Sequence, residues 1–153
     1  MNRRSLIKIV VASAASTIVF AAEGPQDRIP IFVKSGGDAA GFTDPSKARQ
    51  DSVKDLLKKL KNSKSVCPVD SEKDALAVIE VLDRATSREV RFLSAQNKSY
   101  LTVRLTAGEY SVEFAGEAAG GNYTAYSAAA AKVVKQLDAW VKANHDRLLA
   151  SKK

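Results

Sequence analysis

The feature that most constrains the fold is an alternation of apolar and polar residues between positions 100 and 114. Every second residue is apolar in 100–106, the segment 107–109 (Ala-Gly-Glu) interrupts the pattern, and alternation resumes in 110–114. Successive residues of a strand point to opposite faces of a sheet. The pattern therefore predicts a β-hairpin with one buried face and one solvated face.

Two further apolar runs add strands to this hairpin. Residues 29–33 form a short run rich in β-branched side chains, which is typical of a buried strand. Residues 75–82 suit either a buried strand or a helix, and their length and β-branched content favour the strand. Val90 and Phe92 alternate weakly beyond it and extend that strand or add an edge.

Two amphipathic helices are expected to cover the sheet. Asp44 and Pro45 suit the cap and the first position of a helix whose apolar stripe lies within residues 53–60. Residues 116–126 are predicted as a Gly-rich loop, with Ser127 as the cap of a last helix. The element order β-α-β-β-β-α predicts an α/β (α+β) two-layer sandwich, with a mostly antiparallel sheet of about four strands and both helices on one face.

The first 22 residues have the layout of a secretory signal peptide. Arg3, Arg4 and Lys8 give a basic start, and residues 9–22 carry no charge. That run is shorter than the roughly 20 apolar residues that span a bilayer, so we expect cleavage after Ala21 or Ala22 and no transmembrane span afterwards. An uncleaved anchor is the alternative, and the choice between Sec and twin-arginine export stays open. Residues 23–153 then form a single exported domain, periplasmic or extracellular.

Charge gives a modest preference for anionic partners. The formal net charge of +7 falls to +4 once the three basic residues of the leader are removed. That value fits weak attraction to anionic envelope polymers better than nucleic-acid binding, which we do not expect. The candidate contact is the face of the first helix that carries Lys54, Lys58 and Lys61.

Residue types that carry catalysis or bind metal are scarce. The chain has one Cys and one His, which excludes a multi-thiolate zinc site and any site that needs two imidazoles. Cys67 lies in a predicted connection and is expected to be an inert thiol or to pair between chains, and His145 receives no role. The acidic cluster at residues 70–74 is predicted to be a solvated loop. We therefore expect no catalytic, cofactor-binding or metal-binding residues.

Two Gly-rich loops each follow a strand and precede a helix. If the first and last strands lie side by side and parallel, both loops open at the same end of the sheet, where α/β folds often bind ligands. Two tyrosines in the second loop suit stacking on a sugar or a peptide, or alternatively pack as a staple over the helix start. The candidate ligand or partner residues are Gly36, Gly37, Gly120, Gly121, Tyr123 and Tyr126.

Four segments carry a resemblance to known proteins: residues 31–33, the helix at 53–60, the hairpin at 103–113 and the Trp-bearing segment at 134–140. Together they resemble small uncharacterised exported bacterial α/β proteins. More distantly, the chain is similar to the N-terminal α/β domain of the Tol–Pal translocation protein and to the curli-assembly lipoprotein core. Those relatives have a lipobox or an attached propeller, which we do not find, so pore formation and a Tol partner are not expected.

These observations predict a non-enzymatic binding or assembly module of the bacterial envelope. It would act through a sheet edge or through the loop end that carries the two tyrosines. The alternatives are a small periplasmic hydrolase with an unrecognised site and a basic surface binder of anionic polymers. The expected partner is another envelope protein or such a polymer, and the oligomeric state stays open.

Overall fold

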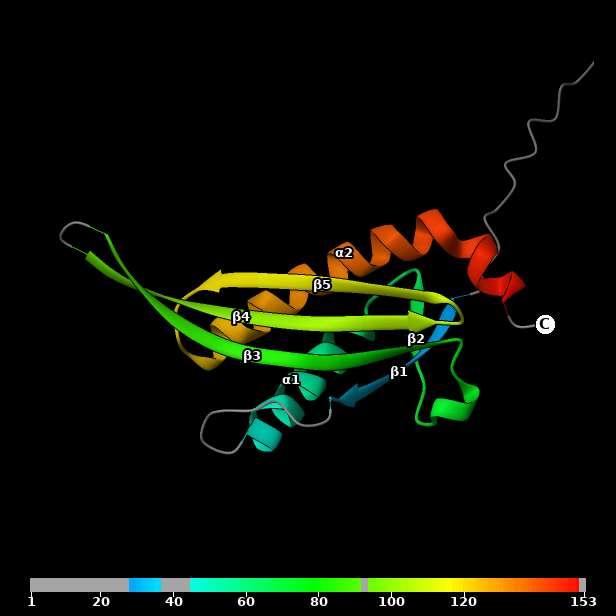
Figure 1. Ribbon diagram of the computed structural model, residues 1–153, viewed down its shortest axis with the longest axis horizontal. Coiled ribbons are helices and arrows are strands. Elements are labelled where there is room, and N and C mark those ends of the chain that lie inside the picture. Colours follow the sequence, from blue (N-terminus) through cyan, green and yellow to red (C-terminus); the bar gives the residue numbers. More distant parts are fainter. Residues whose placement is uncertain (1–27, 37–44, 92–93, 152–153) are drawn as a thin grey trace, which may run out of the picture.

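The computed structural model describes residues 28–36, 45–91 and 94–151. The predicted leader, Gly37, Asp44 and Phe92 lie outside these residues. Within them the chain forms five strands and two α-helices (Figure 1). The elements are β1 (Ile29–Ser35), α1 (Pro45–Leu60), β2 (Val66–Pro68), a 3-10 turn η1 (Glu72–Asp74), β3 (Ala77–Arg91), β4 (Ser94–Ala107), β5 (Tyr110–Ala119) and α2 (Tyr123–Ala150).

The strands form one sheet in the order β2-β1-β3-β4-β5. β1 pairs in parallel with both β2 and β3, while β3, β4 and β5 pair antiparallel. Both helices pack on the same face and contact each other (Figure 1). The predicted mixed fold and the hairpin are confirmed, and the expected number of four strands is wrong by one.

The missed strand is β2, where Cys67 sits in a strand and not in a connection. It is only three residues long and ends at Pro68, so no alternation could mark it in the sequence. It forms because Ile29 and Ile31 of β1 lie beside Val66 and Pro68 in parallel register.

β3 is the strand predicted at residues 75–82, and it continues through Val90 to Arg91. Its register against β4 shifts between Val81 and Asp83, where the strand carries a β-bulge. Before the bulge, the side chains of Ile79 and Val81 face the helices. Beyond it, Arg84 lies opposite the buried Leu101 in the strand register, and its side chain faces the helices.

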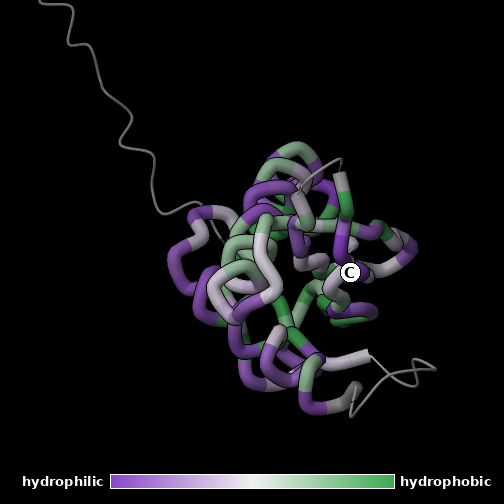
Figure 2. Tube along the Cα trace, turned by 90° about the vertical axis from the view of Figure 1, so that its left-hand side faces the viewer, coloured by the Kyte–Doolittle hydropathy of each residue, from purple (hydrophilic) through white to green (hydrophobic). Residues whose placement is uncertain are grey.

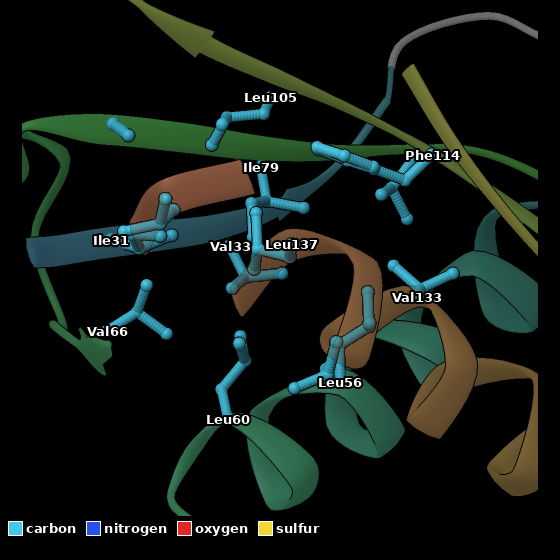
Figure 3. Close-up of a cluster of buried hydrophobic side chains, with 14 of the residues drawn as sticks. Ile31, Val33, Leu56, Leu60, Val66, Ile79, Leu105, Phe114, Val133 and Leu137 are labelled. Atoms are coloured by element: carbon cyan, nitrogen blue, oxygen red, sulfur yellow. The ribbon is translucent and has the colours of Figure 1, made fainter. Parts of the chain in front are cut away.

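The core fills the space between the helices and one face of the sheet. Ile31 and Ile79 of the sheet and Leu56 and Leu137 of the helices are fully buried there and meet in one cluster (Figure 3). Viewed from the end of the molecule, the most hydrophobic residues lie toward the middle of the trace, and many of the outer turns are hydrophilic (Figure 2). No helix of the described residues is long and apolar enough to cross a bilayer.

The start of α2 differs from the expectation. Residues 116–119 complete β5, and Asn122 caps the helix by accepting a hydrogen bond at its Oδ1 from the Ala125 backbone N–H at 3.1 Å. Ser127 lies inside the helix. Asn is as good a cap as Ser, and Gly120 with a φ of 106° lets the chain turn sharply just before it.

α2 approaches β5 most closely at Gly116. A Cβ atom at that position would lie 2.2 Å from the carbonyl oxygen of Ala129 and 3.0 Å from a methyl carbon of Val133. The absence of a side chain therefore lets the helix backbone rest directly on the strand.

Gly116→Ala is expected to lower the free energy of unfolding by about 1–3 kcal/mol, because the new methyl group must push α2 away from β5. Urea denaturation followed by circular dichroism measures the change. Ala115→Ser, on the opposite face of the same strand, is the control and should change stability by less than about 0.5 kcal/mol. Equal stabilities of the two variants would contradict the close approach.

Candidate functional site: the free edge of β5

The two edges of the sheet differ in length and protection. β2 is three residues long and contains Pro68, which has no N–H to offer. β5 is a ten-residue strand at the opposite edge and pairs only with β4 among the described strands. β5 is therefore the edge with room for an added strand.

The register shows which backbone groups of β5 are free. Ala107 and Tyr110 close a two-residue hairpin, and such a closing pair exchanges hydrogen bonds. At the other end, the Gly120 N–H donates to the Asn97 carbonyl at 2.6 Å. Position 120 is an even number of residues from position 110, so both ends of the strand indicate the same alternation of bonded positions. In an antiparallel pair the bonded positions alternate. The outward N–H and C=O groups thus belong to Ser111, Glu113, Ala115, Glu117 and Ala119.

One of these outward groups already has a partner. The side-chain amide of Gln136, on α2, donates to the carbonyl oxygen of Ala115 at 3.0 Å. α2 therefore reaches the edge at the middle of β5 and covers a single acceptor there.

The face of the sheet opposite the helices carries paired charges. Arg104 donates from Nε and Nη2 to one oxygen of Glu113 on the neighbouring strand, at 3.2 and 2.8 Å. Lys98 lies 3.0 Å from Glu89, and this hydrogen bond is the largest cause that raises the pKa of Lys98. These pairs are partly solvated, so their individual contributions to stability are small.

The described glycines of the two loops lie at the ends of strands that are not neighbours. β1 lies between β2 and β3, and β5 lies at the far edge, so the first and last strands are not side by side and the condition for a shared loop end is not met. Gly36 closes the end of β1 through a backbone hydrogen bond to the Val81 carbonyl at 2.8 Å. β3 and β4 separate Gly36 from Gly120 and Gly121, although both loops leave the same end of the sheet.

Tyr126 packs as a structural side chain. Its ring lies under the guanidinium of Arg84, whose Cζ is 3.8 Å from the ring centre, and its hydroxyl hydrogen-bonds the hydroxyl of Thr86. Arg84 also donates to the Ala48 carbonyl and to the hydroxyl of Ser52 on α1. This arrangement joins β3, α1 and α2.

Tyr123 is 63% exposed, yet its hydroxyl is held by the buried Asp55 of α1. The hydrogen bond to Asp55 and then its negative charge raise the pKa of Tyr123 above the ordinary value of 10.0. Oδ2 of Asp55 is buried without a hydrogen-bond partner among the described residues, and it has no accessible surface through which a ligand could reach it. The pair connects the two helices and leaves only the Tyr123 ring open to solvent.

The lysines proposed to contact an anionic surface are exposed side chains. Lys54 and Lys58 lie on α1, Lys61 follows its last residue, and Lys54 lies 3.7 Å from Asp51. This surface is separate from β5, which lies at the other side of the sheet.

Other candidate groups do not gather into a site. Glu72 of the acidic cluster lies in η1 and pairs with Lys34 at 3.4 Å. No group of three or more His, Cys, Asp or Glu residues comes together in the described ranges. A surface cavity of about 360 Å³ runs along the C-terminal half of α2, and its lining residues are Ser65, Lys142, Ala143, Asn144, His145, Asp146 and Arg147.

Comparison with known proteins does not show a family for this chain. No family model and no curated protein matches the chain. An uncharacterised lipoprotein B from Nitrosomonas europaea is 13% identical and aligns over 80% of this chain and 88% of its own, with a TM-score of 0.45. A hypothetical protein from Chlamydia trachomatis is 12% identical over 76% of this chain and 95% of its own, with a TM-score of 0.41.

A PelC dodecamer from Paraburkholderia phytofirmans is 14% identical over 73% of this chain and 85% of its own, with a TM-score of 0.41. Scores and identities of this size carry no argument about function. None of these three structures is the Tol–Pal translocation protein or the curli-assembly lipoprotein, so both of those resemblances stay predictions.

The folded protein is expected to lose stability at alkaline pH partly through Tyr123. Its pKa is higher in the folded state than in the unfolded chain, so the bond to Asp55 contributes fully below about pH 10 and is lost as the pH rises through the folded value. Between neutral and strongly alkaline pH, the melting temperature should therefore fall more steeply for the wild type than for Tyr123→Phe.

The raised pKa of Lys98 acts in the same direction, but it is common to both proteins and cancels in the comparison. Parallel pH profiles for the wild type and Tyr123→Phe would show that the hydroxyl does not hold Asp55.

Proposed function

We propose that this protein is a non-enzymatic binding or assembly module of the bacterial envelope that accepts an extended segment of another protein along β5. The single observation that carries the proposal is the long free edge, with outward backbone groups at alternate residues and one guarded acceptor. Main-chain hydrogen bonds supply affinity in this binding mode, and side-chain pockets supply specificity. The envelope location rests on the signal-like leader in the sequence.

The free edge favours strand addition over the loop end with the two tyrosines. Tyr126 is engaged with Arg84 and Thr86, and the Tyr123 hydroxyl is engaged with Asp55. A ligand that stacked on Tyr126 would have to displace the guanidinium. The backbone groups of β5 need no such rearrangement apart from release of Gln136.

The hydrolase alternative has one observation in its favour, the cavity beside His145. Six of its seven lining residues are consecutive on α2, and the seventh is Ser65. His145 Nδ1 is 3.4 Å from Asp146 Oδ1, at the long limit for orienting an imidazole. Turnover of a small-molecule ester or amide that is lost in His145→Ala would support this function over binding.

Ala115→Pro is expected to abolish partner binding while the domain stays folded. Proline removes an N–H that points away from β4, so no hydrogen bond within the sheet is lost. Ala115→Val keeps the N–H and is the matched control. Retention of envelope proteins on immobilised wild type and both variants, in low and high salt, measures the effect.

Proteins that bind the wild type and Ala115→Val, but not Ala115→Pro, and resist salt would support strand addition. Amide exchange should then slow at the outward residues 111, 113, 115, 117 and 119 once the partner is added. Equal retention by Ala115→Pro would overturn the proposal. Retention that disappears in salt and in Lys58→Glu would instead indicate an anionic polymer bound to α1.

A further inference from the structure

A row of alternating charge crosses the open face of the sheet and ends at β5. Successive register partners on β1, β3, β4 and β5 are Lys34, Glu80, Arg104 and Glu113. All four belong to the parity that faces away from the helices, because Val33, Ile79, Val103 and Phe114 are the buried neighbours. The charges alternate along this row from positive at Lys34 to negative at Glu113. A strand added beside β5 would therefore lie next to a carboxylate.

Contacts within the row show how far each charge is satisfied. Arg104 donates hydrogen bonds to one oxygen of Glu113, and the Glu113 side chain remains 53% exposed. At the other end, the Lys34 ammonium lies 3.4 Å from Glu72. At the β1 end, Lys34 therefore has a partner outside the row, whereas at the β5 end the Glu113 carboxylate stays accessible.

A second carboxylate lies on the same face of the same strand. Glu117 follows Glu113 by four residues, about 13 Å along an extended chain. Its charge contributes, after Glu89, to the raised pKa of Lys98. β5 itself contains no Lys or Arg, so the edge presents two carboxylates at one spacing and no cation of its own.

This pattern disfavours a second copy of the chain as the added strand. Two antiparallel β5 strands centred on Ala115 would put Glu113 of one opposite Glu117 of the other. Centring on Glu113 or Glu117 would put that carboxylate opposite itself, and centring on Phe114 would put Glu113 opposite Ala115, so no β5 register gives these carboxylates a cation. Like charges directly opposite each other destabilise a strand pair. Charge complementarity therefore favours a different chain with cations at matching positions.

An added strand would need apolar residues on the side of β5 that faces the helices. Val112 and Phe114 point to that side, and the Trp140 ring of α2 meets Tyr110 and Phe114 edge-on with centroids 6.3 and 6.4 Å apart. Side chains of an added strand on that side would continue this apolar surface. Gln136 has to release the Ala115 carbonyl, and a backbone N–H of the incoming strand takes its place.

We infer that the β5 edge recognises an extended segment with Lys or Arg at two positions four residues apart and apolar residues at the alternating positions. This inference rests on the proposed function and names the chemistry of its partner. The spacing holds for a parallel or an antiparallel strand, because the two carboxylates are four residues apart in either direction.

Synthetic peptides of alternating Val and Thr test it, with two Lys residues placed among the Thr positions four apart. One control carries Glu at both sites, and another has the same composition with the two Lys residues at Thr positions two apart. Fluorescence titration should show the first peptide binding about three- to tenfold more tightly than the peptide with Lys two apart, and the difference from the Glu peptide should be larger still. Gln136→Ala should tighten binding of all three, and raised salt should shrink the difference.

Charge reversal gives a gain that misfolding cannot imitate. The double variant Glu113→Lys and Glu117→Lys should prefer the Glu peptide, while Glu109→Lys, in the turn before β5, should keep the wild-type preference. Binding that needs the edge but ignores peptide charge would overturn the inference and leave the proposed function standing. Binding unchanged in Ala115→Pro would overturn the proposed function, and concentration-dependent dimers in sedimentation would contradict the exclusion of a second copy.

Discussion

Burial of only one face of the sheet is the constraint on which the rest of this structure depends. α1 and α2 pack together on that face, and the core of Ile31, Ile79, Leu56 and Leu137 lies between them and the strands. No helix of the described residues covers the other face, which therefore carries polar and charged pairs such as Arg104 with Glu113. In the same arrangement α2 packs on one face of β5, and at the outer edge of the strand its Gln136 reaches the Ala115 carbonyl.

A polar junction holds the two helices against the long strand. Arg84 of β3 reaches the Ala48 carbonyl and Ser52 on α1 and covers the ring of Tyr126 on α2. Asp55 and Tyr123 add a second link between the helices. A guanidinium suits this position because its planar group stacks on an aromatic ring while its N–H groups still donate in the plane.

Much of the fold was predictable because it is encoded locally. The hairpin of β4 and β5 follows from period-two alternation, and α1 starts at Pro45 as its sequence indicates. β2 was missed because three residues carry no period, and the start of α2 was missed because Asn122 and Ser127 are both good caps. Local patterns say which segments form strands, but they do not say which strands are neighbours.

The candidate site shows the same limit more sharply. The free edge was anticipated only as one of two possibilities, and the tyrosines were expected at a loop that the structure resolves into a helix start. The charge row joins residues as distant in sequence as Lys34 and Glu113, so it exists only through the registers of four strands. Glu113 and Glu117 stand four residues apart in the sequence, yet nothing in the sequence shows that they border an edge.

The bulge between Val81 and Asp83 has a consequence for the whole outer half of β3. Because Leu82 is one extra residue against β4, residues 83–90 would point to the opposite faces if the strand paired straight through Leu82 without a bulge. Arg84 would then project into solvent, and Asp83 would be driven against the helices in its place. The attachment of both helices to the far end of the sheet thus depends on a count of one amino acid.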